Sequence, residues 1–167
     1  SPEDAARYEQ WNKLREVGLD QNKINDILLT NKGLRPDPST YLSQDYINTH
    51  LALFDDGATK FSANIPKGIA GPPGGTFAMP TSLADKLILQ SGGDIFKLEK
   101  LLSLDDGTLG ENPIRIDIPL PNDIRMPSGN ELGANTQWLP GGYTQGGIVE
   151  ATITSPKPSE YIISKIN

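Results

Sequence analysis

The clearest structural signal in the chain is the run Ile114-Arg115-Ile116-Asp117-Ile118. Isoleucine alternates with charged residues, which is the period-two pattern of a β-strand that buries one face. Further short segments resemble strands, with glycine and proline between them; they span residues 59–65, 75–79, 124–126, 137–139, 148–154 and 161–163. This pattern predicts a twisted, mainly antiparallel sheet.

The first part of the chain is predicted to be helical. Ser1 and Pro2 form a helix start, Gly18 ends that helix, and Asp20 caps a second, shorter one. We interpret residues 1–36 as a helical hairpin that forms an N-terminal segment for docking or linked to transport. Residues 37–167 are then expected to form an α+β domain.

Three further helices complete the predicted fold. The third helix of the chain is expected from Ser39 or Thr40 to about Phe54, where apolar and aromatic residues recur at intervals of four. Two more begin near Thr81 and Asp94, between segments that we interpret as strands. The fold class is therefore α+β: N-terminal helices followed by a twisted, mainly antiparallel sheet with two inserted helices.

Composition restricts the function classes. The net charge of −6 and the isoelectric point near 4.7 disfavour a protein that binds phosphate backbones through a broad basic surface. Cysteine is absent and histidine occurs once, so we expect no thiol chemistry, no metal site and no paired-histidine mechanism. No apolar run approaches the length of a membrane span. Because the chain begins at Ser1 without Met, we expect it to be a fragment of a longer protein.

Four segments in the stretch from Tyr41 to Ile153, which spans roughly two-thirds of the chain, carry a likeness to known proteins. They are Tyr41-Leu42-Ser43-Gln44-Asp45-Tyr46-Ile47 with His50 and Gly57-Ala58-Thr59-Lys60-Phe61; Gly75-Thr76-Phe77-Ala78-Met79-Pro80-Thr81-Ser82; Arg125-Met126-Pro127-Ser128-Gly129-Asn130-Glu131 with Gly133-Ala134-Asn135; and Trp138-Leu139-Pro140-Gly141-Gly142-Tyr143-Thr144-Gln145-Gly146-Gly147-Ile148-Val149-Glu150-Ala151.

These segments resemble the C-terminal toxin modules of contact-dependent growth inhibition and filamentous-haemagglutinin-like exoproteins. The resemblance implies an antibacterial polymorphic toxin that is secreted as part of a large cell-surface exoprotein and acts in the cytoplasm of the target cell. It also implies a cognate immunity protein as partner, so that the chain is a monomer or one half of a toxin–immunity heterodimer.

A weaker resemblance points to the chemistry. A strand with basic and aromatic residues, a Phe-x-x-Pro-x-Ser segment at 77–82 and a late glycine-rich strand ending in Glu150 are similar in order to ADP-ribosyltransferase-like and necrotizing-toxin-like enzymes, which split NAD. Those families place arginine on the first strand, whereas this chain has Lys60. The resemblance implies NAD as substrate, by glycohydrolysis or ADP-ribosyl transfer, with no separate cofactor.

Glu150 is the leading catalytic candidate. It shares the predicted strand face with Ile148 and Thr152, and a carboxylate on such an apolar face is costly unless it is paired or functional. In an NAD-splitting enzyme it would hold the nicotinamide ribose or stabilise the oxocarbenium-like charge of the transition state. The alternative is a surface glutamate paired with a lysine.

The glycine-rich segment 140–147 is a candidate for substrate binding. Its glycines let backbone N–H groups approach a ligand closely. Tyr143 would stack on nicotinamide, with Thr144 and Gln145 hydrogen-bonding to it. A plain two-glycine hairpin turn explains the same residues.

The polar segment before Trp138 is a second binding candidate. Arg125 would clamp the diphosphate with its planar guanidinium, or Lys60 would meet it. The other residues assigned to binding here are Ser128, Asn130, Asn135 and Trp138. The alternative for Arg125 is a salt bridge with Asp117 or Asp123.

His50 supports a different enzyme. A tRNA-cleaving ribonuclease toxin would use His50 for proton transfer, together with Lys60, Arg125 and Thr144. The position of His50 on the helical stripe instead favours a partly buried, structural histidine. A non-catalytic binding or entry module is the third alternative.

Overall fold

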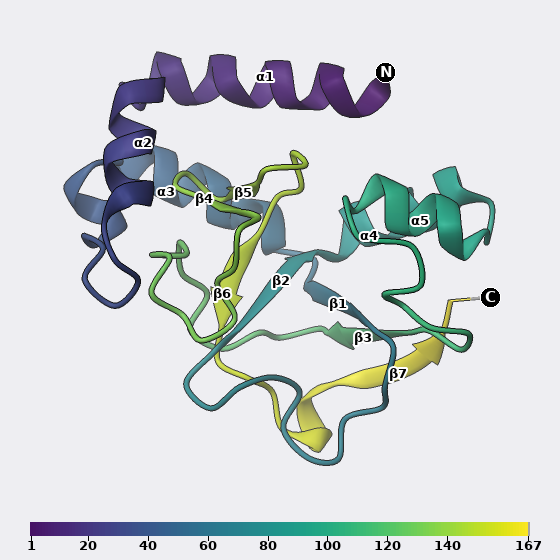
Figure 1. Ribbon diagram of the computed structural model, residues 1–167. Helices are drawn as coiled ribbons and strands as arrows, with labels where there is room; N and C mark the ends of the chain where they lie inside the picture. Colours follow the sequence, from purple (N-terminus) through teal and green to yellow (C-terminus); the bar gives the residue numbers. More distant parts are fainter. Residues whose placement is uncertain (167) are drawn as a thin grey trace.

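A five-stranded antiparallel sheet forms the centre of the computed structural model, which describes residues 1–166 apart from the side chains of residues 2, 3, 6 and 7 (Figure 1). Its strand order is β6-β2-β1-β3-β7. The strands are β1 (Ala58–Ser62), β2 (Thr76–Pro80), β3 (Ile114–Ile118), β6 (Ala151–Ile153) and β7 (Ile162–Lys165), and all neighbours are antiparallel. The expected α+β class with a mainly antiparallel sheet is confirmed.

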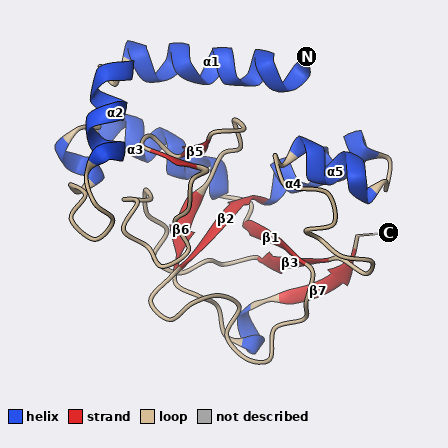
Figure 2. Cartoon of the chain, viewed as in Figure 1, coloured by secondary structure: helices blue, strands red, loops and turns tan. Residues whose placement is uncertain are grey.

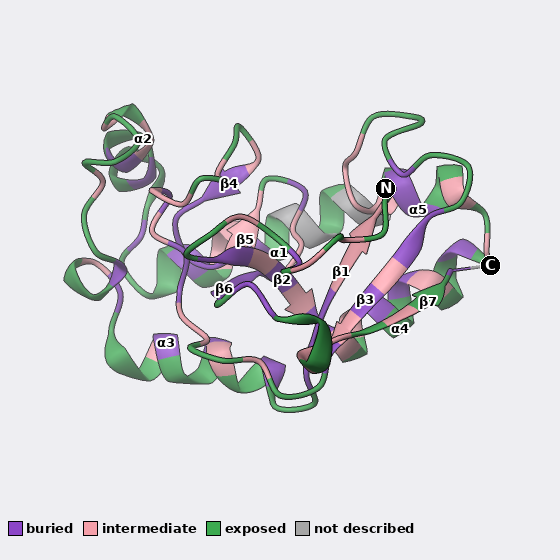
Figure 3. Cartoon of the chain, turned by 90° about the horizontal axis from the view of Figure 1, so that it is seen from below, coloured by how far each residue is buried: buried purple, intermediate pink, exposed green. Residues whose placement is uncertain are grey.

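The two faces of the sheet bury different groups. Ile114, Ile116 and Ile118 of β3 pack with residues of β1, β2 and β6 and with Phe54 in one cluster, as their alternation predicts. On the other face, Phe61 and Met79 pack against a second cluster. That cluster contains Leu87 of α4 (Thr81–Ser91) and Leu98 of α5 (Ile95–Leu101). Figure 3 shows the central strands mainly buried or intermediate in exposure.

The two inserted helices are confirmed between β2 and β3. Helix α4 contacts both β1 and β2, and it ends at Gly92, whose φ of 61° lies in the left-handed region. Helix α5 begins at Asp94, whose side chain accepts a hydrogen bond from the Lys97 N–H. The loop that follows α5 then turns back toward the sheet.

The N-terminal helices α1 (Pro2–Glu16) and α2 (Gln21–Leu29) begin at the caps that the sequence predicts. The Ser1 and Asp20 side chains accept hydrogen bonds from the N–H groups of Asp4 and Lys23. Both helices bury apolar residues in a cluster shared with later parts of the chain: Leu14, Leu19, Ile24, Ile27, Leu42, Ile47, Met126, Trp138 and Leu139. The first 36 residues therefore share a core with the rest, and the domain boundary at residue 36 stays a prediction.

Some predicted boundaries are wrong. Where one helix was expected from Ser39 or Thr40, a short 3-10 turn η1 (Pro38–Thr40) comes first. Helix α3 (Gln44–Leu51) then begins after its own cap, Ser43, and continues into η2 (Ala52–Phe54). Two caps in succession, at Asp37 and Ser43, divide the expected helix.

The predicted strands around the later glycines are shorter than expected. Residues 124–126 form only a bridge between Arg125 and Thr152, and the strand predicted over 148–154 is reduced to β6. A separate ribbon pairs β4 (Trp138–Leu139) with β5 (Tyr143–Thr144), and η3 (Pro158–Glu160) precedes β7. Figure 2 shows the long loops that join these elements. Within the described residues, no helix combines the length and the apolar character that crossing a bilayer requires.

Candidate functional site

Two adjoining hollows form a groove between the sheet and the β4–β5 ribbon. They have volumes of about 190 Å³ and 180 Å³. Both are lined by the same central residues: Phe77, Leu102, Leu104, Thr144 and Glu150. Since these residues line both hollows, we treat them as two lobes of one groove, with Glu150 at their junction.

Different parts of the chain supply the walls of the groove. Phe77 stands on β2 opposite Thr152 of β6. Leu102 and Leu104 come from the loop after α5, in which the Leu104 N–H donates to the Glu99 carbonyl at 2.8 Å. This loop meets the ribbon at Gly146, where a Cβ would collide with the Ser103 side chain. Glycine at 146 therefore allows the two walls to approach each other.

The backbone of Glu150 is held on both sides. Its N–H donates to the Gly142 carbonyl at 2.9 Å, and its own carbonyl accepts a hydrogen bond from Nε2 of His50 at 2.9 Å. Because a carbonyl only accepts, His50 carries its proton on Nε2 when the ring is neutral. The position of the Glu150 carboxyl is thus set by the main chain and by a buried ring.

One oxygen of the Glu150 carboxyl is buried without a hydrogen-bond partner. The residue is 9% exposed, and its Oε1 has no hydrogen-bond partner among the described residues. Burial raises the pKa of the carboxyl to about 8; the nearby Glu131 adds to the increase and Lys60 opposes it. The neutral acid therefore predominates at neutral pH. The predicted burial of Glu150 with Thr152 is confirmed, whereas its catalytic role stays a prediction.

His50 is packed among aromatic rings. Its ring centroid lies 6.2 Å from that of Tyr46, 6.3 Å from that of Phe54 and 5.4 Å from that of Tyr143. Burial lowers the pKa of His50, and the hydrogen bond to the Glu150 carbonyl opposes that shift. His50 does not line the groove, so its described contacts are those of a structural histidine behind Glu150.

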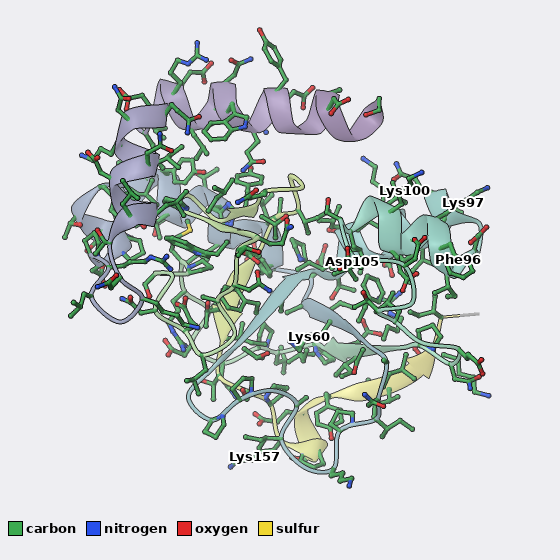
Figure 4. All side chains as sticks on the ribbon, viewed as in Figure 1. Lys60, Phe96, Lys97, Lys100, Asp105 and Lys157 are labelled. Atoms are coloured by element: carbon green, nitrogen blue, oxygen red, sulfur yellow. The ribbon has the colours of Figure 1, made fainter. Side chains whose placement is uncertain are left out.

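Lys60 points to the opposite face of the sheet from Glu150. It pairs in register with Ile116, whose side chain belongs to the buried cluster on that other face. Its Nζ donates to Thr76 Oγ1 at 2.6 Å and to the Phe77 carbonyl at 2.7 Å. Burial lowers the pKa of Lys60 to about 8, and Glu150 opposes the shift. Figure 4 shows Lys60 in the middle of the sheet.

Arg125 is held away from the groove. Its guanidinium forms a salt bridge of 2.7 Å with Asp123 and donates to the Gly74 carbonyl at 2.9 Å. It borders a different hollow, which Asp37 and Glu131 also line. The structure therefore does not bring Arg125, Lys60 and Glu150 together in one cavity, and the salt bridge weighed for Arg125 is formed with Asp123.

The residues assigned to substrate binding divide into two groups. Thr144 lines both lobes of the groove, and Asn135 and Trp138 line one of them. The others make contacts elsewhere. Tyr143 packs against His50, and Gln145 donates to the Thr136 carbonyl. Ser128 donates to Glu131, and Asn130 accepts hydrogen bonds from the N–H groups of Gly33 and Arg35.

Sequence reasoning missed the apolar walls of the groove. Phe77 lies on a predicted strand and Leu102 continues the apolar pattern of the helix after Asp94, so the sequence assigns both to the core, and Leu104 follows in a loop. The signal that points to Phe77 is the Phe-x-x-Pro-x-Ser segment, which was noted without assigning a role to the ring. For the two leucines no local signal exists, since only the return of the loop brings them to the sheet.

The donor set of the groove is poor in metal ligands. Glu150 is its one ionisable lining residue within the described part of the chain, and no group of three or more His, Cys, Asp or Glu residues gathers there to bind a metal. What the lining offers is one buried acid, three aromatic rings, two hydroxyls and two side-chain amides, which belong to Glu150, to Phe61, Phe77 and Trp138, to Thr59 and Thr144, and to Asn135 and Gln137. Such a groove suits an apolar or cationic ring better than a phosphate.

Comparisons with family models, with curated proteins and with solved structures found no match. The resemblance to toxin modules therefore stays a prediction from the sequence.

Proposed function

We propose that this chain is a toxin enzyme that breaks the N-glycosidic bond between nicotinamide and ribose in NAD. The observation that supports it is the unpartnered carboxyl of Glu150 at the junction of the two lobes. An acid held neutral by burial is stabilised in its charged form by a cation placed beside it. The nicotinamide ring of NAD is such a cation, and the transition state develops positive charge on the ribose next to it.

Glu150 would change its charge during the reaction. When the positively charged ring enters the groove, the pKa of Glu150 falls and its proton leaves to solvent. The resulting carboxylate is unscreened by water, so it stabilises the ribosyl cation as the bond from C1′ to the ring nitrogen breaks. The bonding electrons stay on nitrogen, and nicotinamide departs as a neutral molecule.

Water completes the hydrolysis. Its oxygen forms the new bond to C1′, and the proton that it loses returns to the Glu150 carboxylate, which restores the neutral acid. The balance is one NAD and one water consumed, with one nicotinamide, one ADP-ribose and one proton released. Transfer to a protein side chain instead of water would follow the same course with a different nucleophile.

The biological setting is part of the same proposal and rests on the resemblance of the four quoted segments. The chain would be carried on a large secreted exoprotein and consume NAD in the cytoplasm of the target bacterium. A cognate immunity protein would form a heterodimer with it in the producing cell. Covering the groove, and with it Glu150, is the simplest way for that partner to inhibit.

Nicotinamide release from NAD by the purified chain tests the proposal. Glu150→Gln keeps the volume of the side chain but removes the charge change, so we expect the rate to fall about a hundredfold or more. Glu111→Gln removes one exposed carboxylate away from the groove and serves as the matched control, with an unchanged rate.

Two results would contradict the proposal. One is a Glu150→Gln variant that is folded and as active as the parent chain. The other is NAD left intact by the parent chain while total tRNA is cut, which would favour the ribonuclease alternative.

A further inference from the structure

The groove contains the groups that recognise an aromatic cation and lacks those that recognise a phosphate. Phe77 lines both lobes together with Glu150, and Phe61 lines one of them. Trp138 also lines one lobe, but it is 2% exposed and its ring already contacts the Arg35 guanidinium at 4.9 Å, so the two phenylalanines supply the accessible aromatic surface. Aromatic faces attract a cation that lies over them, and a buried carboxylate adds a full charge. Among the described residues no lysine or arginine lines either lobe. A diphosphate in this groove would lose its water and gain no cation in return.

The basic residues close to the sheet are engaged elsewhere. Arg125 is bound to Asp123 and Gly74, and Lys60 donates to Thr76 and Phe77 on the opposite face. Lys97 and Lys100 are exposed and stand on the outer surface of α5 (Figure 4). Neither belongs to the lining of the groove.

The volume of the groove independently limits how much of the substrate it can hold. Cavities that enclose a drug-sized ligand have volumes of about 300 to 1,000 Å³. The two lobes measure about 190 Å³ and 180 Å³, so even together they reach only the lower end of this range. One lobe accommodates a single ring and the neighbouring lobe a sugar, with Glu150 between them. An adenosine diphosphate group would extend beyond the lobes into solvent.

We infer that the groove recognises only the N-ribosylpyridinium end of its substrate, so that nicotinamide riboside, which lacks the phosphates and the adenosine, is split as well as NAD. This inference rests on the proposed function and names its substrate class. Enzymes that draw binding energy from remote groups lose rate when those groups are removed. Here the remote half of NAD meets no described cation in the groove, so its removal has little effect.

Comparing NAD, nicotinamide mononucleotide and nicotinamide riboside as substrates tests the inference. We expect kcat/KM for the three compounds to agree within about fivefold, which is roughly 1 kcal/mol of differential binding. 1-Methylnicotinamide, which is methylated on the ring nitrogen and is therefore a pyridinium cation without ribose, should inhibit competitively. Neutral nicotinamide should inhibit at least about tenfold more weakly.

Two variants separate the contribution of the Phe77 ring from that of the exposed lysines on α5. Phe77→Leu keeps an apolar side chain but removes the ring, and it should raise KM for all three substrates by a similar factor. The double variant Lys97→Glu with Lys100→Glu reverses the exposed charges of α5, and it should leave the ratio of NAD to riboside activity unchanged.

The outcomes distinguish a failure of this inference from a failure of the proposed function. If NAD is split in a Glu150-dependent way and the riboside is at least a hundredfold poorer, the restriction to the pyridinium end is wrong while the proposed function stands. If the variant Lys97→Glu with Lys100→Glu loses activity on NAD but keeps activity on the riboside, the lysines of α5 bind the diphosphate and the inference is wrong. If none of the three compounds is split, the proposed function fails, and this inference fails with it.

Discussion

The pH dependence of stability in Glu150→Gln is the most direct test of the buried carboxyl. In the folded chain the pKa of Glu150 is raised by burial to about 8 from an ordinary value of 4.5. Between these values the unfolded chain has lost the proton and the folded chain retains it. Folding therefore binds a proton, and Glu150 makes the free energy of unfolding decrease as pH rises.

The size of the effect follows from the two pKa values. One pH unit corresponds to about 1.4 kcal/mol when only one state is protonated. From pH 5 to pH 7, with the unfolded chain partly protonated at the start, the loss is about 2.5 kcal/mol. For a chain of 167 residues this is roughly 5 to 10 °C in Tm.

Urea denaturation of the parent chain, Glu150→Gln and Glu111→Gln at pH 5 and pH 7 measures the difference. Glu150→Gln should gain about 2.5 kcal/mol relative to the parent over this interval, and Glu111→Gln should track the parent. Burial also lowers the pKa of His50, but this residue is present in all three proteins and its contribution cancels from the comparison. A relative gain below about 0.5 kcal/mol would refute the neutral acid, and the proton cycle proposed for catalysis would lose its basis.

Two further outcomes follow from the packing. Gly142→Ala should lose about 3 kcal/mol of stability by denaturant unfolding, because φ is +89° there and a Cβ would collide with the His50 ring. Gly110→Ala, at φ +67°, should lose only about 1 kcal/mol, because a Cβ there would make an ordinary contact with Ala63 at 3.6 Å. Lys60→Met tests the buried amine. The pKa of Lys60 is lowered to about 8 in the folded chain from an ordinary value of 10.5. As pH rises, the folded chain therefore loses this proton at a lower pH than the unfolded chain does. The parent should therefore gain stability relative to the variant from pH 8 to 10.5 and keep a constant difference from pH 5 to 7. A difference that stays constant up to pH 10.5 would contradict this assignment.

Local sequence patterns were sufficient to predict much of the fold. The alternation around Ile116 predicted a half-buried strand, and the caps at Ser1, Asp20 and Asp94 predicted where helices begin. These signals work because strand faces and helix ends are set by residues a few positions apart. The burial of Glu150 was also predictable, because it shares one face of the predicted strand with Ile148 and Thr152, although the observed strand β6 begins one residue later.

The tertiary structure alone decided which candidates meet. Lys60 lies on β1 and Glu150 immediately precedes β6, but their side chains lie on opposite faces of the sheet, and strand register, which decides this, is a non-local property. Arg125 forms a salt bridge with Asp123, two residues away, and so does not reach the groove. Leu102 and Leu104 became groove walls because the loop after α5 folds back onto a ribbon some forty residues later in the chain, an approach that no local spacing encodes.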